Sequence, residues 1–183
     1  NEENTIRIIV EKVLKFNLFD KEIIIVDDCS TDKSREIIQE LSKENSIIKY
    51  FFLEKNFGKG AAINKGFKEA DGDIILIQDA DLEYDPRDIL SLLSEIENKK
   101  CQVVYGSRVL RNPENIKSQN FSHNIRILGN IFLTKLSNFL NNQNLTDAHT
   151  CYKLFNSDLF KSIKLEENDF SFCPEITTKI SLL

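Results

Sequence analysis

The sequence lacks the features that mark membrane-spanning, secreted and zinc-binding chains. No stretch reaches the roughly 18 to 20 apolar residues that a membrane-spanning helix needs, and no signal peptide is recognisable. The 4 cysteines stand singly, without a C-x-x-C pair, and only 2 histidines are present, which argues against a zinc site. A chain of 183 residues can bury a core without disulfides, so we expect reduced thiols and a cytoplasmic location.

Internal repeats, low-complexity tracts and linkers are also absent. We therefore expect a single domain over residues 1–183. The formal net charge of −5 argues against nucleic acid as the main partner. The sequence begins at Asn1 directly before a helical pattern and stops at Leu183 within an apolar one, so we expect this domain to be truncated at both ends and to lack its first strand.

Short apolar or β-branched runs alternate with amphipathic helical patterns as far as Gly106. This alternation predicts βαβ units and an α/β fold, with a mostly parallel sheet flanked by helices. The predicted strands occupy residues 22–26, 47–53, 73–78 and 102–105, and residues 147–155 are expected to be extended. The predicted helices occupy residues 4–18, a segment capped by Ser30 or Thr31, residues 58–70, a segment beginning at Asp85-Pro86, and residues 120–141 and 174–183.

Apolar residues repeat at helical spacing along the predicted helix 120–141. They are Phe121, Ile125, Leu128, Phe132, Leu136 and Phe139. We expect this stripe to pack against the core. The alternative is a helix on a membrane surface, with Arg126 and Lys135 beside it.

Three polar clusters follow predicted strands, at the sheet edge where open parallel sheets bind ligands. In the first, Asp27 and Asp28 come directly after residues 22–26, and their carboxylates could accept hydrogen bonds from a base or ribose. Helix capping by Ser30 and Asp32 is the alternative. In the second, residues 56–62 combine glycines with Lys59 before a helix, which fits either close approach to a ligand or a simple turn.

The third cluster, residues 78–86, carries the most specific pattern. Alternate positions on an extended segment point to one side, so we expect Asp79, Asp81 and Glu83 to converge. Hard oxygen ligands in this number suit Mg²⁺ or Mn²⁺ shared with substrate phosphates. A solvated acidic loop would explain Asp85 as a helix cap but not two aspartates at the end of a buried strand, where a cation would relieve their repulsion.

The motifs together resemble those of the inverting glycosyltransferases of family 2, which have the GT-A fold. Within that family the chain is most similar to the polyprenyl-phosphate hexosyltransferases of the dolichyl-phosphate mannose synthase type. The resemblance rests on Asp27-Asp28-x-Ser30-x-Asp32, Asn56-x-Gly58-x-Gly60, Asp79-Ala80-Asp81 and Gly106-Ser107-Arg108, in this order and spacing. It covers essentially the whole chain, and Asn1-Glu2 resembles the end of the family's first-strand motif.

The resemblance implies a role for each matching residue. The nucleotide sugar would be bound by Glu2, Asp27, Asp28, Lys59 and Asp79. The divalent metal would be held by Asp79 and Asp81, with Glu83 where relatives carry a third ligand, and the acceptor phosphate by Arg108 and Arg126. Residues 146–153 resemble the family's Thr-Asp-x-x-Thr-Gly-Tyr-Lys, with Cys151 in place of glycine, so we expect a local difference in this loop.

These roles predict a metal-dependent transfer of a hexose from a UDP- or GDP-hexose, with inversion, to polyprenyl phosphate at the cytoplasmic face of a membrane. A phosphate acceptor is already anionic and needs positioning, whereas a sugar hydroxyl would need a general base, for which Asp147 is the candidate. Three alternatives stay open at this point. They are transfer to a glycan hydroxyl in cell-surface polysaccharide synthesis, a nucleotidyltransferase, and a non-catalytic module that binds a nucleotide sugar.

Overall fold

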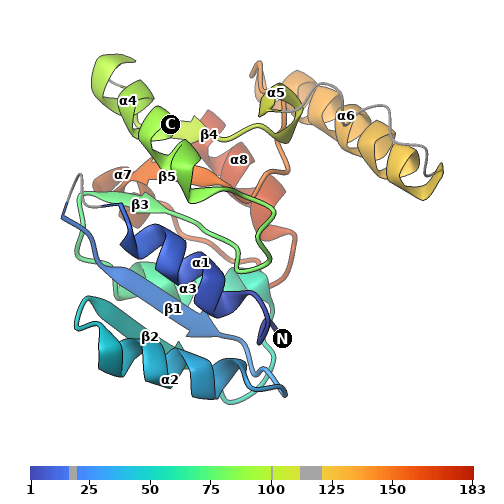
Figure 1. Ribbon diagram of the computed structural model, residues 1–183. Coiled ribbons are helices and arrows are strands. Elements are labelled where there is room, and N and C mark those ends of the chain that lie inside the picture. Colours follow the sequence, from blue (N-terminus) through green and yellow to red (C-terminus); the bar gives the residue numbers. More distant parts are fainter. Residues whose placement is uncertain (17–19, 100, 112–120) are drawn as a thin grey trace.

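A computed structural model describes residues 1–16, 20–99, 101–111 and 121–183 (Figure 1). The strands are β1 (Ile23–Asp27), β2 (Ile48–Phe52), β3 (Ile74–Leu76), β4 (Val103–Tyr105) and β5 (Lys153–Asn156). The helices are α1 (Ile6–Leu14), α2 (Ser34–Glu44), α3 (Lys59–Lys68), the 3₁₀ turn η1 (Pro86–Asp88), α4 (Ile89–Lys99), α5 (Arg108–Arg111), α6 (Phe121–Asn141), α7 (Ser157–Ser162) and α8 (Phe172–Ser181). The predicted α/β class is confirmed.

The first two strands form a parallel pair between helices. β1 and β2 run in register from Ile23 opposite Ile48 to Asp27 opposite Phe52. Side chains alternate along β1 because successive residues of a strand point to opposite faces. Ile23 and Ile25 pack in a core with α1 and α2, whereas Ile24 and Val26 lie against Gly66 of α3.

The other three strands form a separate sheet in the order β3-β5-β4, with β5 antiparallel to both neighbours. One face, with Ile75 and Phe155, packs on α3, α7 and α8. The opposite face, with Leu76 and Leu154, packs on α4. This antiparallel insertion of a late strand between two earlier ones places residues 147–152 beside the ends of β3 and β4.

The start of α2 differs from the expected cap. The helix begins at Ser34, and its first residue is not capped by Ser30 or Thr31. The backbone N–H of Ser30 donates to Asp27 Oδ2 (3.1 Å), and that of Thr31 donates to Asn1 Oδ1 (2.8 Å). These bonds hold both residues in the loop, while Asp32 Oδ1 accepts from Ser34 N at 3.0 Å.

The expected core packing of the α6 stripe is wrong. Figure 1 shows α6 extending away from the sheets and their covering helices. The described members of the stripe are all exposed, with 66% of Phe132 and 83% of Phe139 open to solvent. The helical period was correct, but periodicity alone does not tell which surface an apolar face meets. Within the described ranges, no helix is long and apolar enough to cross a membrane.

Candidate active site

Asp27 and Asp28 end β1 and make different contacts. Asp27 is buried, and Nε of Arg35 lies 2.5 Å from its Oδ2. Burial alone would raise the Asp27 pKa, but hydrogen bonds from Ser30 and Arg35 outweigh it and the pKa is lowered. Asp28 accepts the backbone N–H groups of Phe57 (2.7 Å) and Gly58 (2.8 Å). Asp28 therefore joins the first polar cluster to the second.

Glu2 lies beside the same loop. Its backbone N–H donates to Ser34 Oγ at 2.8 Å, and its carboxylate accepts from Thr5 Oγ1. The neighbouring Glu3 N–H donates to Asp32 Oδ2 at 3.1 Å. The structure thus brings together the first cluster and the residue that resembles the end of the family's first-strand motif.

Gly58 and Gly60 allow a close approach to the loop, and in the structure another segment of the same chain makes this approach. A Cβ at either position would meet the backbone of residues 167–168 well inside van der Waals contact. Gly58 also has φ +97°, a conformation that side chains strongly disfavour. Ala61 N–H donates to Asn168 O at 3.0 Å, so a backbone segment covers this loop.

Lys59 links the second and third clusters. Its Nζ donates to both carboxylate oxygens of Asp79 at 2.7 Å and lies 2.9 Å from Cys151 Sγ. Burial alone would lower the Lys59 pKa, but the charges of Asp79 and Cys151 outweigh it and the pKa is raised. The structure therefore places an ammonium group from the first residue of α3 directly at the first aspartate of the Asp-Ala-Asp motif.

The extended course expected for Asp79, Asp81 and Glu83 is wrong. The chain turns here, with Leu82 at φ 63° and Asp81 Oδ1 accepting from Glu83 N at 2.9 Å. Glu83 instead faces Arg108, with Oε1 3.3 Å from Nη1. Among the described residues, no group of three His, Cys, Asp or Glu side chains is placed to hold a metal ion. An Asx-type turn thus engages the Asp81 carboxylate locally.

Arg108 and Asp147 form a partly buried ion pair. Arg108 Nε lies 2.8 Å from Asp147 Oδ2 and Nη2 lies 3.0 Å from Oδ1, while Asn130 Nδ2 adds a bond of 3.1 Å. The Asp147 side chain is fully buried and that of Arg108 is 34% exposed. Burial alone would raise the Asp147 pKa, but the pairing with Arg108 outweighs it and the pKa is lowered. Both oxygens of this carboxylate are thus occupied. Arg126 belongs to α6, but its side chain lies outside the described residues.

Two buried residues position the loop before β5, and the sequence alone assigned no role to either. Tyr84 stacks on Tyr152 with ring centroids 4.9 Å apart, and its hydroxyl accepts from Cys151 N at 3.2 Å. Burial raises the Tyr84 pKa to about 12. Lys153 is fully buried, donates to the Thr150 carbonyl and lies 4.8 Å from the Tyr105 ring. Burial lowers its pKa. The lysine that ends the motif at residues 146–153, directly before Leu154 and Phe155, is the sequence signal for this buried position.

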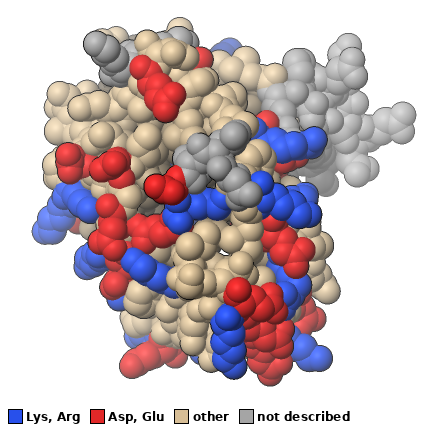
Figure 2. Space-filling view, turned by 60° about the vertical axis from the view of Figure 1, so that its left-hand side comes forward, with Lys and Arg blue, Asp and Glu red and all other residues tan. Residues whose placement is uncertain are grey.

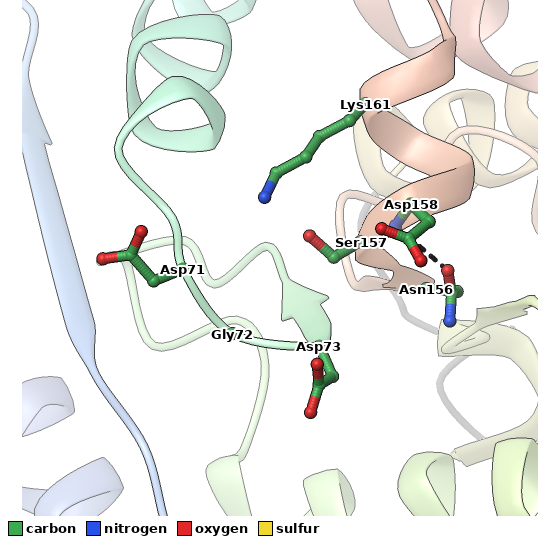
Figure 3. Close-up of a pocket in the computed structure, with 7 residues that line it drawn as sticks. All are labelled: Asp71, Gly72, Asp73, Asn156, Ser157, Asp158 and Lys161. Carbon is green, nitrogen blue, oxygen red and sulfur yellow. Dashed lines mark hydrogen bonds between the residues drawn. The ribbon is translucent and has the colours of Figure 1, made fainter.

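A small polar pocket of about 100 Å³ lies at the other end of β3 (Figure 3). Figure 3 shows Lys161 and Ser157 reaching toward it from α7, opposite Asp71 and Asp73. None of the predicted site residues lines it. On the face shown in Figure 2, Lys and Arg side chains are interspersed with Asp and Glu.

Comparison with known proteins places the chain in a sugar-transferring enzyme family. A model of glycosyl transferase family 2 matches residues 1–164, and the chain belongs to that family. The chain is similar to the crystal structure of S. aureus TarS, residues 1–349, in complex with UDP. The TM-score is 0.63 at 20% identity, covering 99% of this chain and 52% of that one. The predicted family and GT-A fold are confirmed.

Two curated relatives align along nearly the whole chain. A dolichyl-phosphate beta-glucosyltransferase of Trichomonas vaginalis is 31% identical over 180 residues, 95% of this chain and 54% of that protein. A dodecaprenyl-phosphate galacturonate synthase of Rhizobium johnstonii is 29% identical over 178 residues, 95% of this chain and 50% of that protein. The chain spans about half the length of these relatives.

Proposed function

We propose that this protein transfers a hexose, with inversion, from a nucleoside diphosphate sugar to a polyprenyl phosphate. The observation that carries the choice of acceptor is the pairing of Asp147. Its oxygens are taken by Arg108 and Asn130 and its pKa is lowered, which is the opposite of what a general base for a sugar hydroxyl needs. A phosphate acceptor needs no such base. The names of the two relatives support the same acceptor class.

The donor's diphosphate would lie between Lys59 and the Asp79-Ala80-Asp81 motif. Asp79 and Asp81 supply hard oxygen donors that fit Mg²⁺ or Mn²⁺, ions that commonly combine one or two carboxylates with substrate phosphates. The bound ion would stabilise negative charge on the nucleoside diphosphate leaving group. Lys59, which neutralises Asp79 in the structure, would pass to a phosphate oxygen when the ion takes its place.

The acceptor phosphate would bind at Arg108. The Nε and Nη2 atoms stay on Asp147, which fixes the plane of the guanidinium. In the described part of the chain Nη1 contacts Glu83 at 3.3 Å, and this longer contact at the surface is the one that a phosphate would replace. Arg126 is proposed as the second arginine at this phosphate. Positioning of two anions by separate cations is the main contribution of these residues.

A direct test of the proposal is an assay of the full-length protein with UDP-glucose or GDP-mannose as donor. Undecaprenyl phosphate and a soluble oligosaccharide would be offered as alternative acceptors, with Mn²⁺ or with EDTA. We expect glycolipid product only with the lipid phosphate and only with metal. Product on the oligosaccharide alone would contradict the proposal and favour a glycan hydroxyl, and metal-independent transfer would remove the proposed ion.

The exposed stripe of α6 is proposed to lie on the membrane that contains the acceptor. Serine at Leu128, Phe132 and Phe139 removes apolar surface that is already open to solvent, so folding should be little changed. We expect binding to phosphatidylcholine–phosphatidylglycerol vesicles to weaken by at least about tenfold, since each buried large apolar side chain contributes about 1.5–3 kcal/mol. The measurement is co-sedimentation, with the equally exposed Phe170→Ser as control. Unchanged binding by the triple variant would contradict this placement.

A further inference from the structure

Two cysteines meet beside the proposed donor site. Cys151 Sγ, in the loop before β5, lies 3.9 Å from Cys173 Sγ, in the first turn of α8. All 4 cysteines are free thiols, and Cys173 is buried whereas Cys151 is half-buried. The pair is thus within short reach of a covalent bond, which needs a sulfur–sulfur distance of about 2.05 Å.

The surroundings of the pair connect it to the site. Lys59 Nζ donates to Cys151 Sγ and also holds both oxygens of Asp79. The hydrogen bond between the two sulfurs raises the pKa of the Cys151 thiol and lowers the pKa of Cys173, so Cys173 is the sulfur that favours the thiolate form, the nucleophile in thiol oxidation. The loop that carries Cys151 begins with Asp147, the partner of Arg108. Displacement of Cys151 Sγ would therefore shift Lys59 and Arg108, the cations proposed to hold the donor and the acceptor.

We propose that Cys151 and Cys173 are a modification site, where hydrogen peroxide converts the two thiols into a reversible disulfide. One sulfur attacks the peroxide O–O bond and becomes a sulfenic acid, and the peroxide's other oxygen leaves as water after gaining a proton. The second sulfur then attacks the sulfenic sulfur, and its hydroxyl leaves as a second water. Two electrons pass from the thiols to the peroxide, and a dithiol reverses the change.

Formation of the bond changes the proposed donor site. The two sulfurs must approach by about 2 Å to reach disulfide length. Cys151 Sγ then ceases to be the hydrogen-bonding partner that Lys59 has in the reduced protein, and the loop before β5 is tied to α8. This effect rests on the proposed function. Oxidation should lower the rate of sugar transfer by about a hundredfold, because a displacement of about 1 Å at a positioned reactant costs about that much.

The test is treatment of the protein with hydrogen peroxide, followed by alkylation, proteolysis and mass spectrometry. We expect a peptide linking Cys151 to Cys173 that dithiothreitol removes, and that is absent from Cys151→Ser and from Cys173→Ala. The variant Cys29→Ser/Cys101→Ser should still form it, because those thiols donate to the Glu54 and Glu95 carbonyls instead. Separate oxidation of the two cysteines, without a linked peptide, would overturn the proposed site.

The effect of the disulfide on sugar transfer is measured in a separate experiment. Binding of UDP and of GDP is measured by calorimetry before and after oxidation, alongside transfer, in the wild type and in Cys173→Ala. We expect loss of transfer on oxidation in the wild type, its recovery with dithiothreitol, and no such loss in the variant. If the disulfide forms but transfer is unchanged, the proposed effect of oxidation is wrong, whereas the proposed function is not contradicted. Absence of transfer in the reduced protein would count against the proposed function and leave the disulfide measurable.

Discussion

Asparagine in place of Asp79 should lower the turnover of sugar transfer by about a thousandfold, and Asp81→Asn by about a hundredfold. Each change keeps the side chain's size and removes the charge that a divalent ion requires. The larger effect falls on Asp79 because its carboxylate also holds Lys59, at 2.7 Å, in the path of the diphosphate. The measurement is kcat for glycolipid formation, together with the Mn²⁺ concentration that gives half-maximal activity.

The matched control for these variants is Asp71→Asn. Asp71 is 86% exposed at the opposite end of β3, where it pairs with Lys49. Its loss should leave turnover unchanged while removing the same formal charge. If Asp79→Asn and Asp81→Asn both retained wild-type turnover and metal dependence, the proposed donor site would be wrong. Circular dichroism of each variant separates lost chemistry from lost folding.

Methionine in place of Arg108 should lower the free energy of unfolding by about 2–3 kcal/mol. The change leaves the Asp147 carboxylate buried with Asn130 as its remaining side-chain partner. A fully buried pair would cost about 3–5 kcal/mol to break, but Arg108 is one-third exposed, so solvent screens part of the loss. Urea denaturation at pH 7 measures the effect. In the double variant with Asp147→Asn, the two losses should be less than additive.

The control for Arg108 is Arg87→Met. Arg87 pairs with Asp85 in a similar geometry, but its side chain is 79% exposed, so its loss should leave the denaturation midpoint nearly unchanged. Equal destabilisation by the two variants would show that burial of the Arg108 pair does not matter.

Acid provides a second measurement of the same pair. Because the folded pKa of Asp147 is depressed, its contribution is present above the ordinary carboxyl range, near pH 4, and disappears as pH falls through the folded value. The stability of Arg108→Met should therefore fall less steeply than that of the wild type between about pH 4 and pH 2. Parallel curves would contradict the assignment.

The regular elements could largely be predicted from apolar periodicity. Residues 22–26 form β1 with a shift of one residue, and Asp85-Pro86 starts a helical segment, because each pattern reports only on its own neighbourhood. The antiparallel course of β5 could not be predicted, since pairing joins segments more than 45 residues apart in sequence. The short helices α5 and α7 carry too few residues to show a period.

The sequence named the residues of the candidate site but not the ion pairs that they form. The motifs named Lys59, Asp79, Arg108 and Asp147 as candidate site residues, and the structure pairs Lys59 with Asp79 and Arg108 with Asp147. The sequence did not reveal that Lys59 holds Asp79 or that Arg108 holds Asp147, because ion pairing depends on side-chain direction across separate elements. The turn at Leu82 was missed for a related reason: a leucine with positive φ has no local signature.

The contact between the Asn56–Gly60 loop and residues 167–168 restricts the amino-acid sequence on one side only. The covering side contributes backbone atoms, which every amino acid possesses, and Glu175 anchors it through the N–H groups of Glu166 and Glu167. The covered side depends on the missing Cβ of Gly58 and Gly60. Residues 167–168 can therefore change during evolution without losing this contact, whereas Gly58 and Gly60 cannot. In related sequences we expect the two glycines to be conserved and the covering residues to vary.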